Sequence, residues 1–380
     1  MDLFKHRVLW IPPLGVAALF ILVILFLLPS LTDLTVHWQK IEPAFYESRA
    51  LLFEQLKEEY PARAEAGQKL GLILGTSRAG EFEQADIAKL IPGSYSFYIS
   101  APFSSPIFFA YWLERIFAEG MQPEFVIFEI DPILMTNRAM EFTLQYSLDG
   151  RFVWDRTELY RQLPADPWEA EGRGFSYDEA ESYAAAALFG LHRYPINFDS
   201  IVANNSSLGS MGLMLGFTSP IEFRDHVKGI MQIANKEKLG GIPNPMQAQK
   251  RPEEMIADAR EKTKIFLEGF EISPTQIIFI KNTLRDLARR QIPVVVYWPA
   301  ATAEYHENVR AYEMIEHVQE PLRKLLVEIE AEYPGSYLKM YDPNPDPEFQ
   351  CRSFYDSHHL SGGCFPELTR LLIRRLSPGL

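Results

Sequence analysis

The chain has 380 residues, of which 47% are hydrophobic and 23% are charged, and its formal net charge is −13. This length and hydrophobic content are enough for a large buried core, which excludes a disordered chain. A nucleic-acid-binding protein is also excluded, because phosphate recognition needs clustered Lys and Arg and the sequence contains no basic run.

The N-terminus carries a long apolar run, VLWIPPLGVAALFILVILFLL, at residues 8–28. The run contains no charged residue, and as a helix it is long enough to cross about 30 Å of hydrocarbon. A cleaved signal peptide is the alternative, but the sequence that follows lacks a small-x-small cleavage site. We therefore predict an uncleaved transmembrane anchor over residues 8–30.

The charges around this run predict its orientation. Lys5 and Arg7 precede it, whereas Asp33 and Lys40 follow it. The positive-inside rule then predicts a cytoplasmic tail at residues 1–7 and a single-pass protein of the inner (plasma) membrane. The rest of the chain would be periplasmic or extracellular.

Beyond the anchor, residues 31–66 include an amphipathic stretch that indicates a stalk or a covering helix. Short apolar runs that end in polar or turn residues then indicate buried strands. They are LGLILG (70–75), FVIFEI (125–130), VVVYW (294–298) and the weaker SYLKMY (336–341).

Helical patterns separate these runs, at residues 86–91, 107–120, 274–291 and 321–333. Ser273 and Pro274 stand where the cap and first position of the third helix are expected. Strands that alternate with helices predict a parallel sheet covered on both faces, a three-layer α/β/α domain over residues 67–380.

Residues 150–255 break this alternation, and we interpret them as a mainly helical and loop insertion over one edge of the sheet. The insertion contains a Gly- and Met-rich stretch, SSLGSMGLMLGFTSP, at residues 206–220. A buried hairpin or core loop is the favoured interpretation of this stretch, and contact with a membrane or a partner is the alternative.

Ligands of open parallel sheets bind beyond the carboxyl ends of the strands, which directs attention to the residues that follow each apolar run. Ser77 follows Gly75 and Thr76 at the end of the first run. A small residue there allows a sharp turn that points the hydroxyl into a cleft and leaves its own amide free for an oxyanion. A turn serine or a helix-capping serine is the structural alternative.

A serine needs a base to become a nucleophile, and the loop after the last apolar run supplies one. Asp356 and His359 are three residues apart, so they project to one side of a turn. The carboxylate can hold one ring nitrogen while the other takes the serine proton. His358 lacks this register unless the segment is extended, and Asp356 could otherwise simply cap a helix.

GLILGTSRAGEF near the start of the α/β region and YDSHHLSGG near its end resemble the first and last sequence blocks of the SGNH (GDSL-like) hydrolase superfamily. With the single N-terminal span, the chain resembles a membrane-anchored branch of that superfamily, which includes the D-alanyl-lipoteichoic-acid transfer protein and alginate and peptidoglycan O-acetyltransferases. The resemblance implies Ser77 as nucleophile, His359 as base and Asp356 as the residue that orients it. It also implies a membrane-bound acyltransferase as partner.

The chain departs from that pattern where a glycine and an asparagine usually complete the oxyanion hole. Asn137 and Ser104 stand near the expected places, and a hole made of backbone amides is the alternative. Arg78, next to the proposed nucleophile, either binds an anionic acyl or acceptor group, pairs with Asp131, or faces solvent.

The chain has two cysteines, Cys351 and Cys364, which flank the Asp356–His359 motif. Outside the cytoplasm such a pair favours a disulfide, with two free thiols as the alternative. Zinc held by both cysteines, His358 and His359 has suitable ligand types, but the spacing fits no short-loop zinc pattern.

From these features we predict a membrane-anchored serine esterase or O-acyltransferase that acts on an envelope polysaccharide or lipid and needs no metal or cofactor. A non-catalytic envelope scaffold or partner-binding protein of the same fold is the alternative, because the oxyanion blocks are missing.

Overall fold

The computed structural model describes residues 11–23, 42–160, 164–188, 220–241, 247 and 250–376. The chain divides into two compact units. One comprises Met1–Pro43 and Asp178–Val227, and the other comprises Ala44–Tyr177 and Lys228–Leu380. The first unit includes helix α2 (Ile11–Leu22). It also includes helix α9 (Tyr177–Leu188), except for Tyr177. The second contains the sheet and the candidate site.

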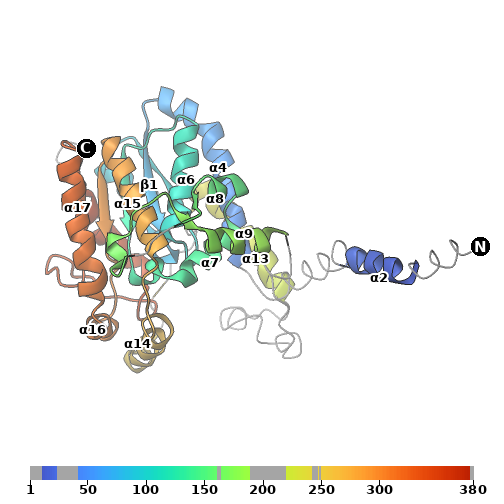
Figure 1. Cartoon of the computed structure of the whole chain (residues 1–380). Coiled ribbons are helices and arrows are strands. Elements are labelled where there is room, and N and C mark those ends of the chain that lie inside the picture. Colours follow the sequence, from blue (N-terminus) through green and yellow to red (C-terminus); the bar gives the residue numbers. More distant parts are fainter. Residues whose placement is uncertain are drawn as a thin grey trace, which may run out of the picture. The chain divides into compact units, whose positions relative to one another are not determined.

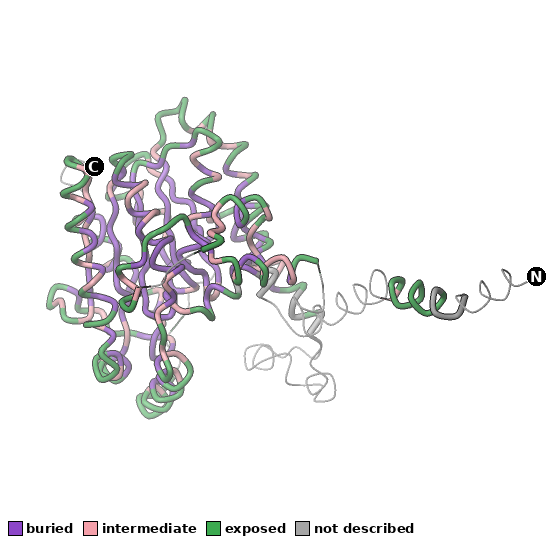
Figure 2. Tube along the Cα trace, viewed as in Figure 1, coloured by how far each residue is buried: buried purple, intermediate pink, exposed green. Residues whose placement is uncertain are grey.

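The sheet has five parallel strands in the order β2-β1-β3-β6-β7. Strands β1, β3 and β6 are strongly apolar and buried on both faces except at the first residue of β1, whereas the two middle residues of β7 are half-buried. Figure 2 shows the sheet as the mostly buried centre of this unit. The strands are β1 (Lys69–Gly75), β2 (Ser94–Ser100), β3 (Phe125–Glu129), β6 (Val294–Tyr297) and β7 (Leu338–Tyr341).

Helices cover the sheet on both sides, as predicted for an α/β domain (Figure 1). On one side α15 packs against both α6 and α17, and on the other α5 packs against α18. The helices of this unit include α4 (Glu42–Glu65), α5 (Gln84–Leu90), α6 (Pro106–Ala118), α7 (Asn137–Tyr146), α8 (Gly150–Trp154), α14 (Pro252–Phe266), α15 (Pro274–Arg289), α16 (Ala303–Ala311), α17 (Glu320–Glu332) and α18 (Phe365–Ile373).

Strand β2 was not among the predicted strands. Its sequence, SYSFYIS, mixes serines with apolar residues, yet all but its first residue are buried. Its outer edge is closed by other parts of the chain: the Tyr98 amide donates to the Leu239 carbonyl at 3.0 Å, and the Ser96 amide donates to Gln84 Oε1 at 2.7 Å. These partners let an edge strand be buried without exposing unpaired amides.

Ser273 is the N-cap of α15 as predicted, but its side chain makes no capping hydrogen bond, and its hydroxyl is buried without a partner among the described residues. Pro274 at the first helical position needs no amide partner, which removes part of the need for a cap.

Helix α4 lies in the region predicted as a stalk or covering helix, and it covers the domain. Leu52, Phe53 and Leu56 are buried, whereas Leu51, on the other side of the helix, is 63% exposed. Arg49 donates to the Tyr98 carbonyl on β2 at 3.0 Å. These contacts join the start of the second unit to its sheet.

The predicted insertion at residues 150–255 begins with α8 and a pair of two-residue strands, β4 (Thr157–Glu158) and β5 (Phe175–Ser176). It continues through α9 and α13 (Pro220–Lys238) into α14. The Gly- and Met-rich stretch lies outside the described residues except for its last residue.

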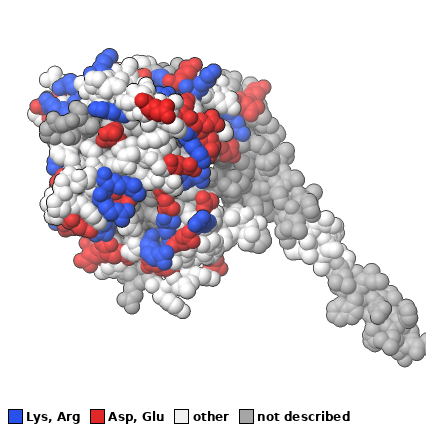
Figure 3. Space-filling model, turned by 90° about the horizontal axis from the view of Figure 1, so that it is seen from above, with Lys and Arg blue, Asp and Glu red and all other residues white. Residues whose placement is uncertain are grey.

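Helix α2 falls within the predicted membrane anchor, but residues 8–10 and 24–30 of that anchor lie outside the described residues. Within the described part of the chain, no helix has both the length and the apolar character needed to cross a membrane. On the face drawn in Figure 3, basic side chains are interspersed with acidic ones rather than gathered into one surface.

Candidate active site

Ser77 begins the short 3-10 helix η2 (Ser77–Glu81), directly after the turn that ends β1. The turn is sharp because Gly75 has no side chain: a Cβ there would lie 2.4 Å from Ala79 Cβ and 2.6 Å from Glu129 Oε2. Ser77 is half-buried, so its hydroxyl is held at the carboxyl end of the sheet without being sealed from solvent.

The other half of the site is a tight hairpin between β7 and α18. Phe354 and Leu360 form an antiparallel bridge across it. At its tip, Asp356 Oδ1 accepts the backbone amides of His358 at 3.0 Å and of His359 at 2.8 Å. The carboxylate of Asp356 therefore fixes the turn that carries the two histidines.

The structure brings Ser77, His359 and Asp356 together. Ser77 Oγ lies 3.0 Å from His359 Nε2, and His359 Nδ1 lies 3.0 Å from Asp356 Oδ1 and 2.9 Å from Oδ2. Because a carboxylate only accepts, Nδ1 carries the proton and the Nε2 lone pair faces the serine hydroxyl. This is the tautomer that a general base for serine needs.

The charge of Asp356 favours this arrangement. Burial alone would raise the pKa of its carboxyl, but the hydrogen bond from His359 and the nearby His358 ring hold the pKa well below its usual range. The carboxylate is thus ionised, and it stabilises the imidazolium that forms when His359 takes a proton.

His358 lies beside the triad without belonging to it. Its ring centroid is 4.2 Å from that of His359, and its Nδ1 is 3.0 Å from Asp356 Oδ1. This close approach is not a hydrogen bond, and Nδ1 is buried without a hydrogen-bond partner among the described residues. Burial lowers the pKa of His358 to about 4, so the ring is neutral at pH 7.

Beneath the nucleophile lies a buried ionic cluster of Arg78, Glu129 and Asp131. Arg78 Nη2 is 2.7 Å from Glu129 Oε1, and its Nη1 is 2.8 Å from Asp131 Oδ2. Glu129 also accepts from Thr76, through the backbone amide at 3.1 Å and through Oγ1 at 2.7 Å. The cluster joins the loop after β1 to the end of β3.

These contacts resolve the alternatives for Arg78. Burial would lower the pKa of the guanidinium, but Asp131 and Glu129 outweigh it and raise the pKa above its ordinary value. With only 7% of its surface exposed and both carboxylates in contact, Arg78 is a structural cation. It is not free to bind an anionic substrate.

Neither oxyanion candidate is placed as a side-chain donor at Ser77. Ser104 is fully buried, and its hydroxyl donates to the Gly75 carbonyl at 2.6 Å. Asn137 is the first residue of α7, and its side chain is exposed. No hydrogen bond joins Asn137 to Ser77 among the described residues. Ser104 therefore supports the nucleophile turn, and the Ser77 amide, at the start of η2, is the better oxyanion donor.

Sequence reasoning missed Asp258, which lies on α14 just beyond the predicted insertion at residues 150–255. Its Oδ2 accepts the Ser357 amide at 2.9 Å, and its Oδ1 is 2.5 Å from Lys250 Nζ. Burial opposes ionisation of Asp258, but the contacts with Lys250 and Ser357 lower the pKa of this carboxyl. The charged carboxylate of Asp258 thus holds the backbone of Ser357, the hairpin residue between Asp356 and His358.

The predicted disulfide is present: Cys351 and Cys364 are joined, and their Cα atoms are 5.5 Å apart. The four-ligand zinc alternative is therefore wrong, because both sulfur atoms are bonded to each other in the disulfide. Asp356, His358 and His359 remain as a group whose ligand atoms lie within 4.8 Å of one another. Binding of a metal to His359 Nδ1 would displace the hydrogen bond to Asp356, so the geometry favours the triad.

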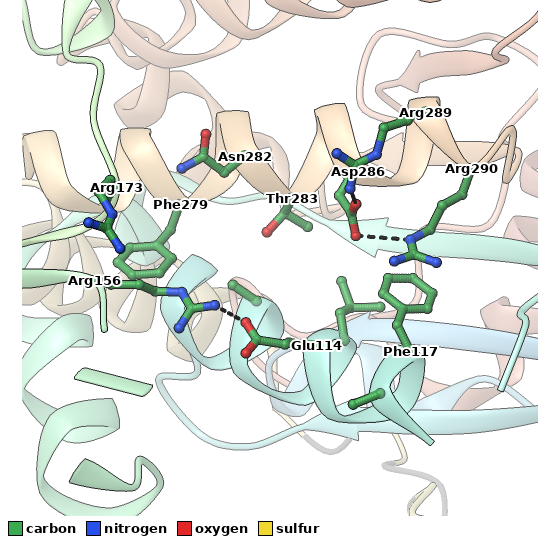
Figure 4. Close-up of a pocket in the computed structure, with 13 residues that line it drawn as sticks. Glu114, Phe117, Arg156, Arg173, Phe279, Asn282, Thr283, Asp286, Arg289 and Arg290 are labelled. Atoms are coloured by element: carbon green, nitrogen blue, oxygen red, sulfur yellow. Dashed lines mark hydrogen bonds and ion pairs between the residues drawn. The ribbon is translucent and has the colours of Figure 1, made fainter. Parts of the chain in front are cut away.

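A cavity of about 520 Å³ lies between α6 and α15, away from the triad (Figure 4). Arginines line it, but Arg156 pairs with Glu114, and Arg289 and Arg290 pair with Asp286. None of the triad residues borders this cavity. The hydrogen-bond geometry, rather than the size of a cavity, therefore locates the site.

Residues 3–376 match the model of a family described as "Protein of unknown function (DUF1574)". A search of curated proteins found no match to this chain.

Proposed function

Because this chain belongs to the DUF1574 family, whose function is unknown, its activity has to be inferred from its site, and we propose that it is a serine esterase or O-acyltransferase. One observation carries the proposal: Ser77 Oγ, the His359 ring and the Asp356 carboxylate are linked in series at distances of 2.9–3.0 Å. The resemblance of the two motif blocks to SGNH hydrolases supports the same chemistry.

In the proposed reaction, Ser77 Oγ attacks the ester carbonyl carbon while His359 Nε2 takes the hydroxyl proton. The Ser77 amide donates to the oxyanion that forms. When the tetrahedral intermediate collapses, the ester C–O bond breaks and His359 returns the proton to the leaving alcohol. A sugar hydroxyl or water then attacks the acyl-serine by the same steps.

The apolar, uncharged run at residues 8–28 supports a membrane-anchored protein of the inner (plasma) membrane, with the catalytic domain periplasmic or extracellular. The disulfide that closes the base hairpin is consistent with such an oxidising compartment. A polysaccharide or lipid of the envelope is then the proposed substrate, and the resemblance adds a membrane-bound acyltransferase as the proposed partner.

The test uses the full-length protein, a serine-directed fluorophosphonate and a p-nitrophenyl ester. We expect covalent labelling of Ser77 and ester hydrolysis, and both should be lost in Ser77→Ala. Addition of a glycan acceptor distinguishes the two activities, because only a transferase passes the acyl group to the glycan. Labelling and hydrolysis that persist in Ser77→Ala would contradict the proposal, and a folded protein that shows neither would favour the non-catalytic scaffold.

A further inference from the structure

The hydroxyl of Tyr305 is a polar group near the triad that the triad does not use. Tyr305 is only 3% exposed, yet its hydroxyl forms no hydrogen bond in the described part of the chain. The oxygen is not fully enclosed by protein atoms, so a small molecule can still reach it. An unpaired hydroxyl on a buried residue is an exception in folded proteins, and a catalytic role is one explanation for it.

Helix α16 holds Tyr305 against the hairpin that carries the proposed base. The amide of Thr302, the N-cap of α16, donates to the Ser357 carbonyl at 2.9 Å. One helical turn later, the centroid of the Tyr305 ring is 5.9 Å from that of His358. The His358 ring in turn lies 4.2 Å from the His359 ring, centroid to centroid. Tyr305 is therefore positioned by the same hairpin that positions the base.

Three charges around Ser77 act on the Tyr305 hydroxyl. Burial raises the pKa of the phenol, the carboxylates of Asp131 and Asp356 raise it further, and the guanidinium of Arg78 opposes them. Arg78 follows the nucleophile in the chain, and Asp356 is the carboxylate of the triad. Because such influence weakens with distance, the hydroxyl lies among the groups that flank Ser77. The raised pKa also keeps the phenol protonated, so it is a hydrogen-bond donor at pH 7.

The oxyanion of the proposed reaction needs hydrogen-bond donors, and the site has few. Among the described residues, Ser104 donates to the Gly75 carbonyl and Asn137 is exposed on α7, so neither offers a side-chain donor at Ser77. Backbone and side-chain donors both serve in oxyanion holes. A donor that has no partner in the free protein can bind the oxyanion without first breaking another hydrogen bond, which is the preorganisation that such a site requires.

We propose that Tyr305 is a catalytic residue whose hydroxyl donates a hydrogen bond to the oxyanion that forms when Ser77 attacks the ester carbonyl. This inference rests on the proposed function and adds a side-chain donor to the Ser77 amide. A purely structural role does not explain the hydroxyl, because phenylalanine would fill the same space without an unpaired polar atom. A contact with the bound substrate is a different role, and it would lower KM rather than raise kcat.

The test compares the full-length wild type with Tyr305→Phe, which removes only the hydroxyl. We expect kcat for p-nitrophenyl acetate to fall by about 10²- to 10³-fold with little change in KM, because the oxyanion exists only after the attack. Labelling of Ser77 by the fluorophosphonate should become slower but still reach completion, since the nucleophile and base are intact. The melting temperature should not fall, because the folded protein loses no hydrogen bond.

Tyr95→Phe is the matched control. Tyr95 is 6% exposed, and its hydroxyl is also buried without a hydrogen-bond partner among the described residues. It is the second residue of β2 and pairs with Leu70 near the amino end of β1, whereas Ser77 follows the carboxyl end of β1. We therefore expect Tyr95→Phe to keep the kcat and the labelling rate of the wild type. Circular dichroism confirms that each variant is folded.

A Tyr305→Phe enzyme whose kcat stays within about threefold of the wild type would overturn the inference. A loss confined to KM would also overturn it, as would an equal loss of kcat in Tyr95→Phe. A lower melting temperature with normal kcat per labelled site would show a structural role instead. Labelling of the wild type separates the two proposals. A labelled Ser77 with an unaffected Tyr305→Phe enzyme refutes only the role of Tyr305, whereas a folded wild type that is neither labelled nor active refutes the esterase itself.

Discussion

Ser77 Oγ and His359 Nε2 are 3.0 Å apart although 282 positions separate the two residues in the chain. Ser77 follows β1, which lies between β2 and β3 in the sheet. His359 comes after β7, the strand at the opposite edge. Parallel strands bring their carboxyl ends to one edge, so the first and last segments of the domain meet there. The contact therefore depends on the whole sheet.

The orientation of His359 predicts how Asp356→Asn should behave. An asparagine keeps the size of the side chain but can hold the wrong ring tautomer, with Nε2 protonated and unable to accept from serine. We expect kcat for p-nitrophenyl acetate to fall by about 10³- to 10⁴-fold. Steady-state kinetics check this, and a Ser77→Ala, Asp356→Asn double variant should be hardly worse than Ser77→Ala. An Asp356→Asn enzyme within tenfold of wild type would contradict the role of Asp356.

The strands of the central sheet could largely be predicted, because their apolar runs are buried on both faces and end in turn residues. Strand β2 could not, because its burial depends on Gln84 and Leu239, which supply partners for its outer edge from distant parts of the sequence. The sequence contains no local sign of those partners.

The triad could be proposed because its residues belong to two recognisable motifs, whereas its supports are harder to find. The support from Glu129 is visible in the sequence, because this residue is a carboxylate at the end of a buried apolar strand. A buried carboxylate needs a cation beside it, and here that cation is Arg78. Asp258 gave none, since an aspartate in an amphipathic helix usually faces water. Only the packing of α14 against the hairpin reveals its role.

The buried ring of His358 predicts a loss of stability at low pH. Burial lowers its pKa from the ordinary 6.5 to about 4, so between these values the unfolded chain binds a proton that the folded chain does not. Stability therefore falls as pH falls through this window, by about 2 kcal/mol at pH 5. Urea unfolding of wild type and His358→Gln at pH 7 and pH 5 measures it. The variant should lose less stability than wild type over this interval, and equal losses would contradict the assignment.

The disulfide predicts that reduction should loosen the base hairpin. The bond spans 13 positions and encloses Asp356 and His359, and loss of such a closed loop costs about 3 kcal/mol in the chain-entropy model. We expect dithiothreitol to lower the melting temperature and to reduce ester hydrolysis. The Cys351→Ser, Cys364→Ser variant should resemble the reduced protein. Dithiothreitol should change neither its melting temperature nor its ester hydrolysis. If dithiothreitol acted equally on that variant, its effect would have another origin.

Asp258 is predicted to position the hairpin rather than to touch the substrate. Asp258→Ala removes the acceptor of the Ser357 amide, and we expect kcat to fall by about tenfold while KM changes little, because misplacement of the base affects the chemical step. Asp258→Asn keeps an oxygen for the Ser357 amide but loses the ion pair with Lys250, so its effect should be smaller. A purely structural role would predict thermal destabilisation with normal kcat in the folded fraction, and active-site titration with the fluorophosphonate distinguishes the two results.

The buried cluster predicts the largest effect on stability. Glu129 is fully buried and holds both Arg78 and Thr76, so Glu129→Ala leaves a guanidinium with only Asp131 and frees the nucleophile turn. Breaking a buried pair in this way costs about 3–5 kcal/mol. The matched control is Glu59→Ala, which breaks the partly exposed pair between Glu59 and Arg63 and should cost less than about 1 kcal/mol. Chemical denaturation measures both, and similar losses in the two variants would show that the cluster contributes little to holding Ser77 in place.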